Sequence, residues 1–324
     1  MKFFNTRNWA ALPLALMVVT TFSAGTALAK VPASFYVGKE PTQVFASKET
    51  MVQSNYDKRP LVEALKIDEN VYTYRRDNHR TIFVVTDEGV IVMDPMKPSI
   101  ANGMHQQIRK ITDKPIKYMI YSHNHWDHAR GGKVFKDEGA VVIAHEETAK
   151  EMKKWPDPDM VQPDLTWSGE SHKLSLGGVE LELYHFGPSH GKGLTFFYFP
   201  QKKLLHVIDV ISPNRLPPGI EADFTPKGIL VTLKKVLELD FERAIPSHTP
   251  YVLAGRNAVT DMIDYWNIII ANARATLEKY GDDVPPWFLV EKIPPVEKYK
   301  HWNMYEEFGK GTGARALWEL YYGY

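Results

Sequence analysis

Residues 122–128 read Ser-His-Asn-His-Trp-Asp-His and place four side chains that can bind a metal within six residues. The motif directly follows the apolar run at residues 118–121, which is typical of a buried strand. Neutral imidazoles suit Zn²⁺ and carboxylates suit harder cations, so His and Asp on one loop can divide between two adjacent ions. The alternative is a solvated polar loop. The density of donors favours a metal site built by His123, His125, Asp127 and His128.

The residues around this motif alternate between strand and helix patterns. Turn-bounded apolar runs predict strands over residues 71–74, 81–85, 89–93, 118–121, 140–144, 179–184, 194–199, 203–208 and 243–245. Helical spacing of apolar residues predicts helices over 100–111, 146–154, 229–237, 259–277 and 313–321, and a short helix near residues 61–65. Strands interleaved with helices indicate an α/β protein in which helices cover the sheets.

A strand followed by His-x-His-x-Asp-His resembles the metallo-β-lactamase superfamily, whose fold is an αββα sandwich with metals at one sheet edge. That superfamily has a third His, an Asp and a final His further along the chain. Segments ending in His190, Asp209 and His248 stand in that order, and residues 88–94 are similar to the family's early strand. The resemblance spans about residues 71–251. It implies a four-layer αββα sandwich, here with extra C-terminal helices.

The resemblance also implies how seven ligands divide between two zinc ions: His123, His125 and His190 for one, Asp127, His128 and His248 for the other, and Asp209 as a bridge. Asp127 is implied to be catalytic as well, because it would orient the nucleophile. The best-known zinc β-lactamases place Cys at the bridging position, and this chain contains no Cys. Its pattern is more similar to lactonases, glyoxalase II-like thioesterases and phosphodiesterases. Ser189, Ser247 and Ile208 stand where glycines are common in the family.

The remaining histidines are interpreted as ordinary surface or core residues: His79, His105, His145, His172, His185, His206 and His301. His185 and His206 lie close in sequence to implied ligands, so each is also a candidate for orienting a metal-bound imidazole. Asp94 ends a predicted strand, and its carboxylate is expected to accept a hydrogen bond from a ligand histidine.

The N-terminus has the pattern of a signal peptide. A charged start that includes Lys2 and Arg7 precedes an apolar run from Ala10 to Phe22 and a small-residue end at Ala29. The apolar run is shorter than the roughly 20 residues that a membrane span needs. We expect cleavage after Ala29 and a periplasmic or secreted protein that does not remain in the membrane.

Four segments are therefore predicted: a signal peptide at residues 1–29, an N-terminal arm at 30–70, a metallo-β-lactamase-like core at 71–255, and a C-terminal helical segment at 256–324 packed on the core. Lys plus Arg and Asp plus Glu both number 39, so no basic surface is expected to bind nucleic acid. The expected partner is a small-molecule substrate.

The implied activity is hydrolysis by zinc-bound hydroxide, since two zinc ions that share a water lower its pKa toward ~7. An exported, all-His/Asp site fits a cyclic ester or amide best, such as a lactone or a β-lactam. Phosphodiester, sulfate-ester and thioester hydrolysis are the alternatives within hydrolases. Two other classes stay open, a mononuclear iron oxidoreductase of the same fold and a binding protein that has lost catalysis.

Overall fold

The computed structural model describes residues 37–49, 60–249 and 251–323. The predicted signal peptide and the first residues of the predicted arm lie outside these ranges. Within them, none of the helices combines the length and apolarity that a membrane span requires.

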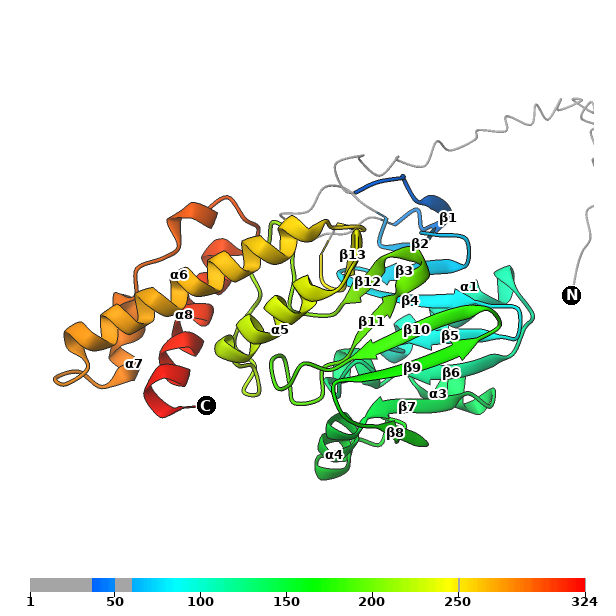
Figure 1. Ribbon diagram of the computed structural model, residues 1–324, viewed down its shortest axis with the longest axis horizontal. Coiled ribbons are helices and arrows are strands. Elements are labelled where there is room, and N and C mark those ends of the chain that lie inside the picture. Colours follow the sequence, from blue (N-terminus) through cyan, green and yellow to red (C-terminus); the bar gives the residue numbers. More distant parts are fainter. Residues whose placement is uncertain (1–36, 50–59, 250, 324) are drawn as a thin grey trace, which may run out of the picture. The chain divides into compact units, whose positions relative to one another are not determined.

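The first sheet has eight strands in chain order (Figure 1). They are β1 (Thr42–Ala46), β2 (Val62–Lys66), β3 (Val71–Arg76), β4 (His79–Val85), β5 (Val90–Met93), β6 (Ile116–Ile120), β7 (Val141–His145) and β8 (Leu165–Trp167). Pairing is antiparallel from β1 to β5 and parallel from β5 to β8. Strand β5 is apolar throughout because it is buried on both faces, with Ile91 and Met93 in one core and Val90 and Val92 in another.

The second sheet has five strands in the order β13-β12-β11-β10-β9. They are β9 (Ser171–Leu176), β10 (Val179–Tyr184), β11 (Phe196–Phe199), β12 (Leu204–Val207) and β13 (Arg243–Pro246). Only β12 and β13 pair in parallel. Leu181 and Leu183 of this sheet join Ile82 and Val84 of the first sheet in one buried cluster. The two sheets therefore pack face to face.

Helices cover both outer faces. Helices α1 (Pro98–Ile111), α3 (Lys133–Asp137) and α4 (Glu146–Lys154) pack on the first sheet, where Ile100 and Met104 join Phe83 in a second core. Helices α5 (Pro226–Glu238) and α6 (Arg256–Tyr280) pack on the second sheet through residues such as Leu233 and Trp266. The four-layer αββα arrangement predicted from the sequence is thereby confirmed.

The short helix predicted near residues 61–65 is wrong, because this segment forms strand β2. A short apolar run carries too little periodicity to separate the two states. Glu63 of β2 lies opposite Arg75, which in turn lies opposite Arg80, so the three form a row across β2, β3 and β4. The Glu63 Oε1 atom is 3.0 Å from Arg75 Nε and 2.9 Å from Arg80 Nη2. Residues 42–46 and 62–66, placed in the arm by the sequence, thus extend the first sheet.

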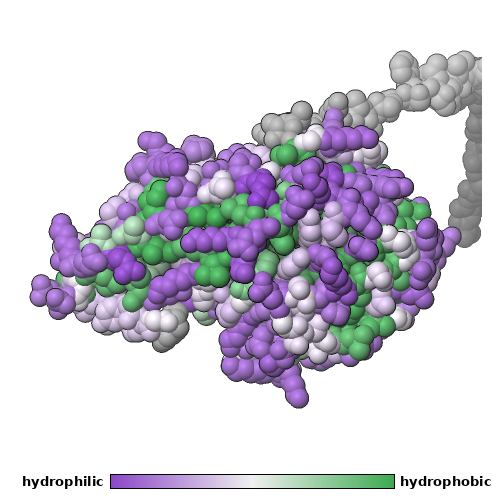
Figure 2. Space-filling view, in the orientation of Figure 1, coloured by the Kyte–Doolittle hydropathy of each residue, from purple (hydrophilic) through white to green (hydrophobic). Residues whose placement is uncertain are grey.

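After α6, the C-terminal segment contains the helices α7 (Pro286–Leu289) and α8 (Tyr305–Tyr322) and two 3₁₀ turns, Val290–Lys292 and Glu297–Tyr299. A further 3₁₀ turn, Pro200–Lys202, connects β11 to β12. Part of α6 lies beyond the sheets, where Ala273 packs with Leu289 and Leu317 (Figure 1). On the face shown in Figure 2, hydrophobic and hydrophilic side chains are interspersed along α6.

Helix α8 begins eight residues before the start predicted at Gly313, a start placed too late because the glycines at 309, 311 and 313 lower the helical propensity of this segment. One of these glycines has a packing role. A Cβ atom on Gly311 would lie 2.8 Å from the carbonyl oxygen of Pro218. Further contacts fasten the same loop: Leu216 N donates to Asn303 O at 3.0 Å, and Arg315 Nε donates to Phe224 O. The C-terminal segment therefore holds the loop that follows β12.

Candidate metal centre

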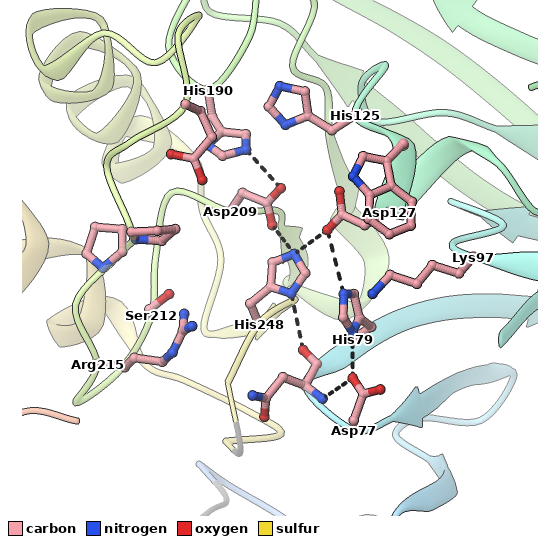
Figure 3. Close-up of a pocket in the computed structure, with 15 residues that line it drawn as sticks. Asp77, His79, Lys97, His125, Asp127, His190, Asp209, Ser212, Arg215 and His248 are labelled. Carbon is pink, nitrogen blue, oxygen red and sulfur yellow. Dashed lines mark hydrogen bonds and ion pairs between the residues drawn. The ribbon is translucent and has the colours of Figure 1, made fainter. Parts of the chain in front are cut away.

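The seven predicted ligands come from separate segments of the chain and meet at one edge of the sandwich. The motif at residues 122–128 follows β6 and continues into the single turn α2 (Trp126–Ala129). Asp209 follows β12, and His248 follows β13. Because β12 and β13 are parallel, their carboxyl ends share an edge. The structure brings all seven side chains together at this edge, and Figure 3 shows several of them facing one cleft.

His123, His125 and His190 form the first group of donors, because one ring nitrogen from each lies within 4.8 Å of the other two. Nε2 of His123 and Nε2 of His190 are each 3.3 Å from Asp209 Oδ2. His123 is fully buried and His190 nearly so. This is the set that the sequence assigned to one ion.

His128 and His248 form the second group together with Asp127. The Oδ2 atom of Asp127 is 3.6 Å from His128 Nε2 and 3.5 Å from His248 Nε2. Asp209 reaches this group too, with Oδ2 3.2 Å from His128 Nε2 and Oδ1 3.1 Å from His248 Nε2. The carboxylate of Asp209 therefore faces both groups, as a bridging residue would.

Neighbouring side chains fix the orientation of the buried rings. Asp94 Oδ2 is 2.9 Å from His128 Nδ1, which confirms the contact expected from its position at the end of a strand. The same carboxylate accepts hydrogen bonds from the backbone N–H of Ser122 at 2.6 Å and from its hydroxyl at 2.5 Å. The Ser122 hydroxyl is also 2.8 Å from His123 Nδ1. Both rings consequently present Nε2 to the site.

Neutral His123 and His190 rings beside an ionised Asp209 suit a bound cation. Burial lowers the pKa of His123, and it lowers the pKa of His190 to about 4, so both rings are in the neutral form that binds metal. Burial also opposes a charge on His128, but Asp209 and Asp127 raise its pKa well above the ordinary value. Burial would favour a neutral Asp209, yet His128 and His248 hold its pKa well below the usual range.

Several ring nitrogens of the site face one another or have no hydrogen-bond partner among the described residues, and a metal ion would satisfy them. Nε2 of His128 and Nε2 of His248 face each other at 2.9 Å, and Nδ1 of each ring is already close to an oxygen acceptor. Nε2 of His123 is buried without a hydrogen-bond partner among the described residues. Converging imidazole nitrogens and carboxylate oxygens are a suitable set for zinc.

Comparison with known proteins identifies the family of this chain. The sequence profile of the metallo-beta-lactamase superfamily matches residues 74–248, which is more than half of the chain. The chain belongs to the metallo-beta-lactamase superfamily. The resemblance inferred from the sequence is thereby confirmed.

The chain is similar to the alpha subunit of 2,4-dinitroanisole O-demethylase from Nocardioides sp., with 28% identity over 79% of this chain and 76% of the relative. A solved metallo-beta-lactamase from Pontibacter korlensis shares its fold with a TM-score of 0.58 and 20% identity, over 64% of this chain and 99% of the other. A stereoselective inverting sec-alkylsulfatase from Pseudomonas sp. superposes with a TM-score of 0.65 and 18% identity, over 81% of this chain and 50% of the other.

Asp223 is a site residue that sequence reasoning missed. Its two carboxylate oxygens are 3.0 and 3.1 Å from Nε2 of His125, which leaves Nδ1 of that ring for a metal. The pair is separated by 98 residues. Asp223 lies in the loop after β12 with no local motif to distinguish it from other surface carboxylates, so the sequence offered no signal.

Among the histidines interpreted as ordinary, His79 is the exception, because it lines the cleft at the metal site. His185 and His206 each place Nδ1 near a backbone carbonyl, at 3.0 Å from Leu194 O and 2.8 Å from Ile245 O. Within the described part of the chain, neither ring hydrogen-bonds one of the seven predicted ligands. His145 stacks on His185, with ring centroids 4.0 Å apart, and belongs to the packing of the fold.

The cleft above the donors has a volume of about 510 Å³. One wall carries Lys97 and the half-exposed ring of Trp126, with Lys97 Nζ 4.9 Å from the ring centroid. The opposite wall is the loop after β12, which contributes Arg215, Pro217 and Glu221. This is the loop that the C-terminal segment fastens. The cleft therefore combines a polar metal-binding floor with a wall of mixed charge.

Proposed function

We propose that this chain is an exported two-zinc hydrolase that acts on a small-molecule substrate. The observation that carries the proposal is the position of Asp209, whose carboxylate lies within 3.3 Å of an imidazole nitrogen in each donor group. Zinc ions bound to such a pair of groups activate water and polarise the bond to be cleaved. Membership of a superfamily that consists mostly of hydrolases supports the same reaction class.

Four carboxylates of the chain would bind the metal ions, orient water and orient the ligand imidazoles. Asp209 is buried and would hold the two ions at a fixed separation. Asp127 is more exposed and lines the cleft, so its carboxylate is placed to bind the second ion and to orient a water molecule beside the substrate. Asp94 and Asp223 orient one imidazole in each group and would keep the donors in place as the substrate binds.

The cleft volume lies within the range of small-molecule sites, roughly 300 to 1,000 Å³. The lactone or β-lactam preference stays a prediction. Two further substrate classes are suggested by the similar proteins, one of which is named as a 2,4-dinitroanisole O-demethylase and another as a sec-alkylsulfatase. The exposed Trp126 ring beside Lys97 suits an apolar or aromatic group that carries negative charge or electron-withdrawing substituents.

The export part of the proposal rests on the first 29 residues, whose charged start, apolar middle and Ala-Leu-Ala end have the pattern of a cleaved signal. A chain without Cys is also suited to a compartment in which free thiols would oxidise.

The test is elemental analysis of protein purified from the periplasm, followed by a substrate panel of lactones, β-lactams, aryl methyl ethers, alkyl sulfates, phosphodiesters and thioesters. We expect two zinc ions per chain and turnover that chelation abolishes and zinc restores. One iron and no zinc would refute the proposed metal centre and support the oxidoreductase alternative.

A further inference from the structure

His79 stands at the tip of the hairpin between β3 and β4, beside the second donor group. Its Nε2 atom is 3.7 Å from Asp127 Oδ2, and its ring centroid is 4.9 Å from that of His248. His79, Asp127 and His248 each offer a donor atom, and these three atoms lie within 4.8 Å of one another. The hairpin therefore places a third imidazole, that of His79, beside the second donor group, for which the sequence predicted only those of His128 and His248.

The hairpin tip is attached to the loop that carries His248. The backbone N–H of Arg80 donates to Ser247 O at 2.9 Å, and His248 Nδ1 is 3.2 Å from Asn78 O. The first contact fixes the start of β4 against the end of β13. The second fixes the ring of His248, so that its Nε2 atom and that of His79 approach Asp127 together (Figure 3).

The ring of His79 is held in the same way as the rings of the predicted ligands. Its Nδ1 atom is 2.5 Å from Asp77 Oδ1, just as His128 Nδ1 is held by Asp94. Asp77 is itself fixed, because Oδ1 accepts a hydrogen bond from Asn78 N at 2.6 Å. A carboxylate on one ring nitrogen and an open site on the other is the arrangement that metal-binding histidines use.

Distances around Asp127 agree with a shared ion. Its Oδ2 atom lies 3.5 to 3.7 Å from the Nε2 atoms of three histidines, His79, His128 and His248. Donors that bind one zinc ion at 2.0–2.1 Å are separated by roughly 3 to 4 Å, depending on the angle between them at the metal. The separation of His79 from Asp127 falls within this range, as do those of the two predicted ligands His128 and His248.

We propose that His79 is an additional ligand of the second metal ion and that Asp77 is the carboxylate that orients it. This inference rests on the proposed two-metal site and extends it. The second ion would then have the imidazoles of His79, His128 and His248 together with the carboxylates of Asp127 and Asp209. Three nitrogen donors favour zinc over harder cations such as Mg²⁺ or Mn²⁺ at this position.

The experiment measures the dissociation constants of the first and second Zn²⁺ ions by titrating the mature, metal-depleted protein against a competing chelator. The variants are His79→Ala and Asp77→Asn, with His301→Ala as a control at an exposed histidine away from the site. We expect His79→Ala to weaken the second ion at least 10-fold and the first ion by less than about threefold, since outer-sphere partners alone contribute roughly 10 to 100-fold. Asp77→Asn should weaken the second ion less than His79→Ala, and His301→Ala should match the wild type.

Zinc X-ray absorption of the fully loaded protein gives an independent readout. The average number of imidazoles per zinc should fall from about three in the wild type to about two and a half in His79→Ala. A wild type that binds only one ion would refute the two-metal proposal itself. A wild type that binds two, with both constants and the imidazole count unchanged in His79→Ala, would refute the role of His79 alone. Should His79→Ala fail to fold, an unchanged second-ion constant in Asp77→Asn would also count against the inference.

Discussion

The buried row of Glu63, Arg75 and Arg80 predicts a strong and pH-dependent contribution to stability. Burial alone would raise the pKa of Glu63, but Arg80 and Arg75 lower it from 4.5 to about 2. A shift of this size corresponds to about 3 kcal/mol of stabilisation, because each pKa unit is worth 1.36 kcal/mol. Replacing the carboxylate removes the negative charge that faces two buried guanidinium groups, and breaking a buried ion pair in this way costs about 3 to 5 kcal/mol in other proteins.

We expect Glu63→Gln to lower the free energy of unfolding by about 3 kcal/mol at pH 7 and the Tm by roughly 6 °C. The pKa of Glu63 is depressed in the folded state, so the stabilisation is complete above pH 4.5 and is lost as the pH falls toward 2. The wild type and the variant should therefore converge in acid. Urea unfolding of both proteins from pH 7 to pH 2.5, with metal removed by chelation, measures the difference.

The matched control is Glu138→Gln, which removes a carboxylate from a partly exposed contact with Arg109. Solvent screens this pair, so its loss should cost less than about 1 kcal/mol. A loss of unfolding free energy in Glu63→Gln no greater than that of this control at pH 7 would refute the predicted role of Glu63. A difference between the wild type and Glu63→Gln that is as large at pH 2.5 as at pH 7 would refute it as well.

Four further outcomes are expected. Asp209→Ala should lose both metals and turnover together, whereas His206→Ala should retain both metals; elemental analysis and turnover of the two variants provide the check. Asp223→Ala should weaken the first metal roughly 10 to 100-fold through loss of the contact to His125, as measured by chelator competition. Gly311→Val should raise KM without changing metal content, because its side chain displaces the loop that forms one wall of the cleft. Mass spectrometry of the exported protein should find Lys30 at its N-terminus.

The layered fold and the donors at residues 122–128 were accessible from local sequence patterns, whereas His190, Asp209 and His248 were assigned through the resemblance to a known family. Apolar runs mark strands such as β5 and β6, and the spacing within residues 122–128 concentrates donors on one loop. Contacts between distant segments have no local sequence pattern that predicts them. Asp223 and His79 are brought to the site by the loop after β12 and by the β3–β4 hairpin, whose positions depend on the tertiary structure. Strand β2 was misjudged for the same reason, since its charged residue Glu63 finds its partners on neighbouring strands.

The metal centre and the contacts that hold one wall of the cleft come from different parts of the chain. The sequences of these two parts can therefore change independently during evolution. Every donor of the metal centre lies at or before residue 248, whereas the contacts that brace the far wall of the cleft come from residues 303–315. A change in the last helix can therefore reshape the space offered to a substrate without touching a ligand. New substrate ranges can arise in such a protein by exchange or extension of its C-terminal segment, while the reactive centre is inherited intact.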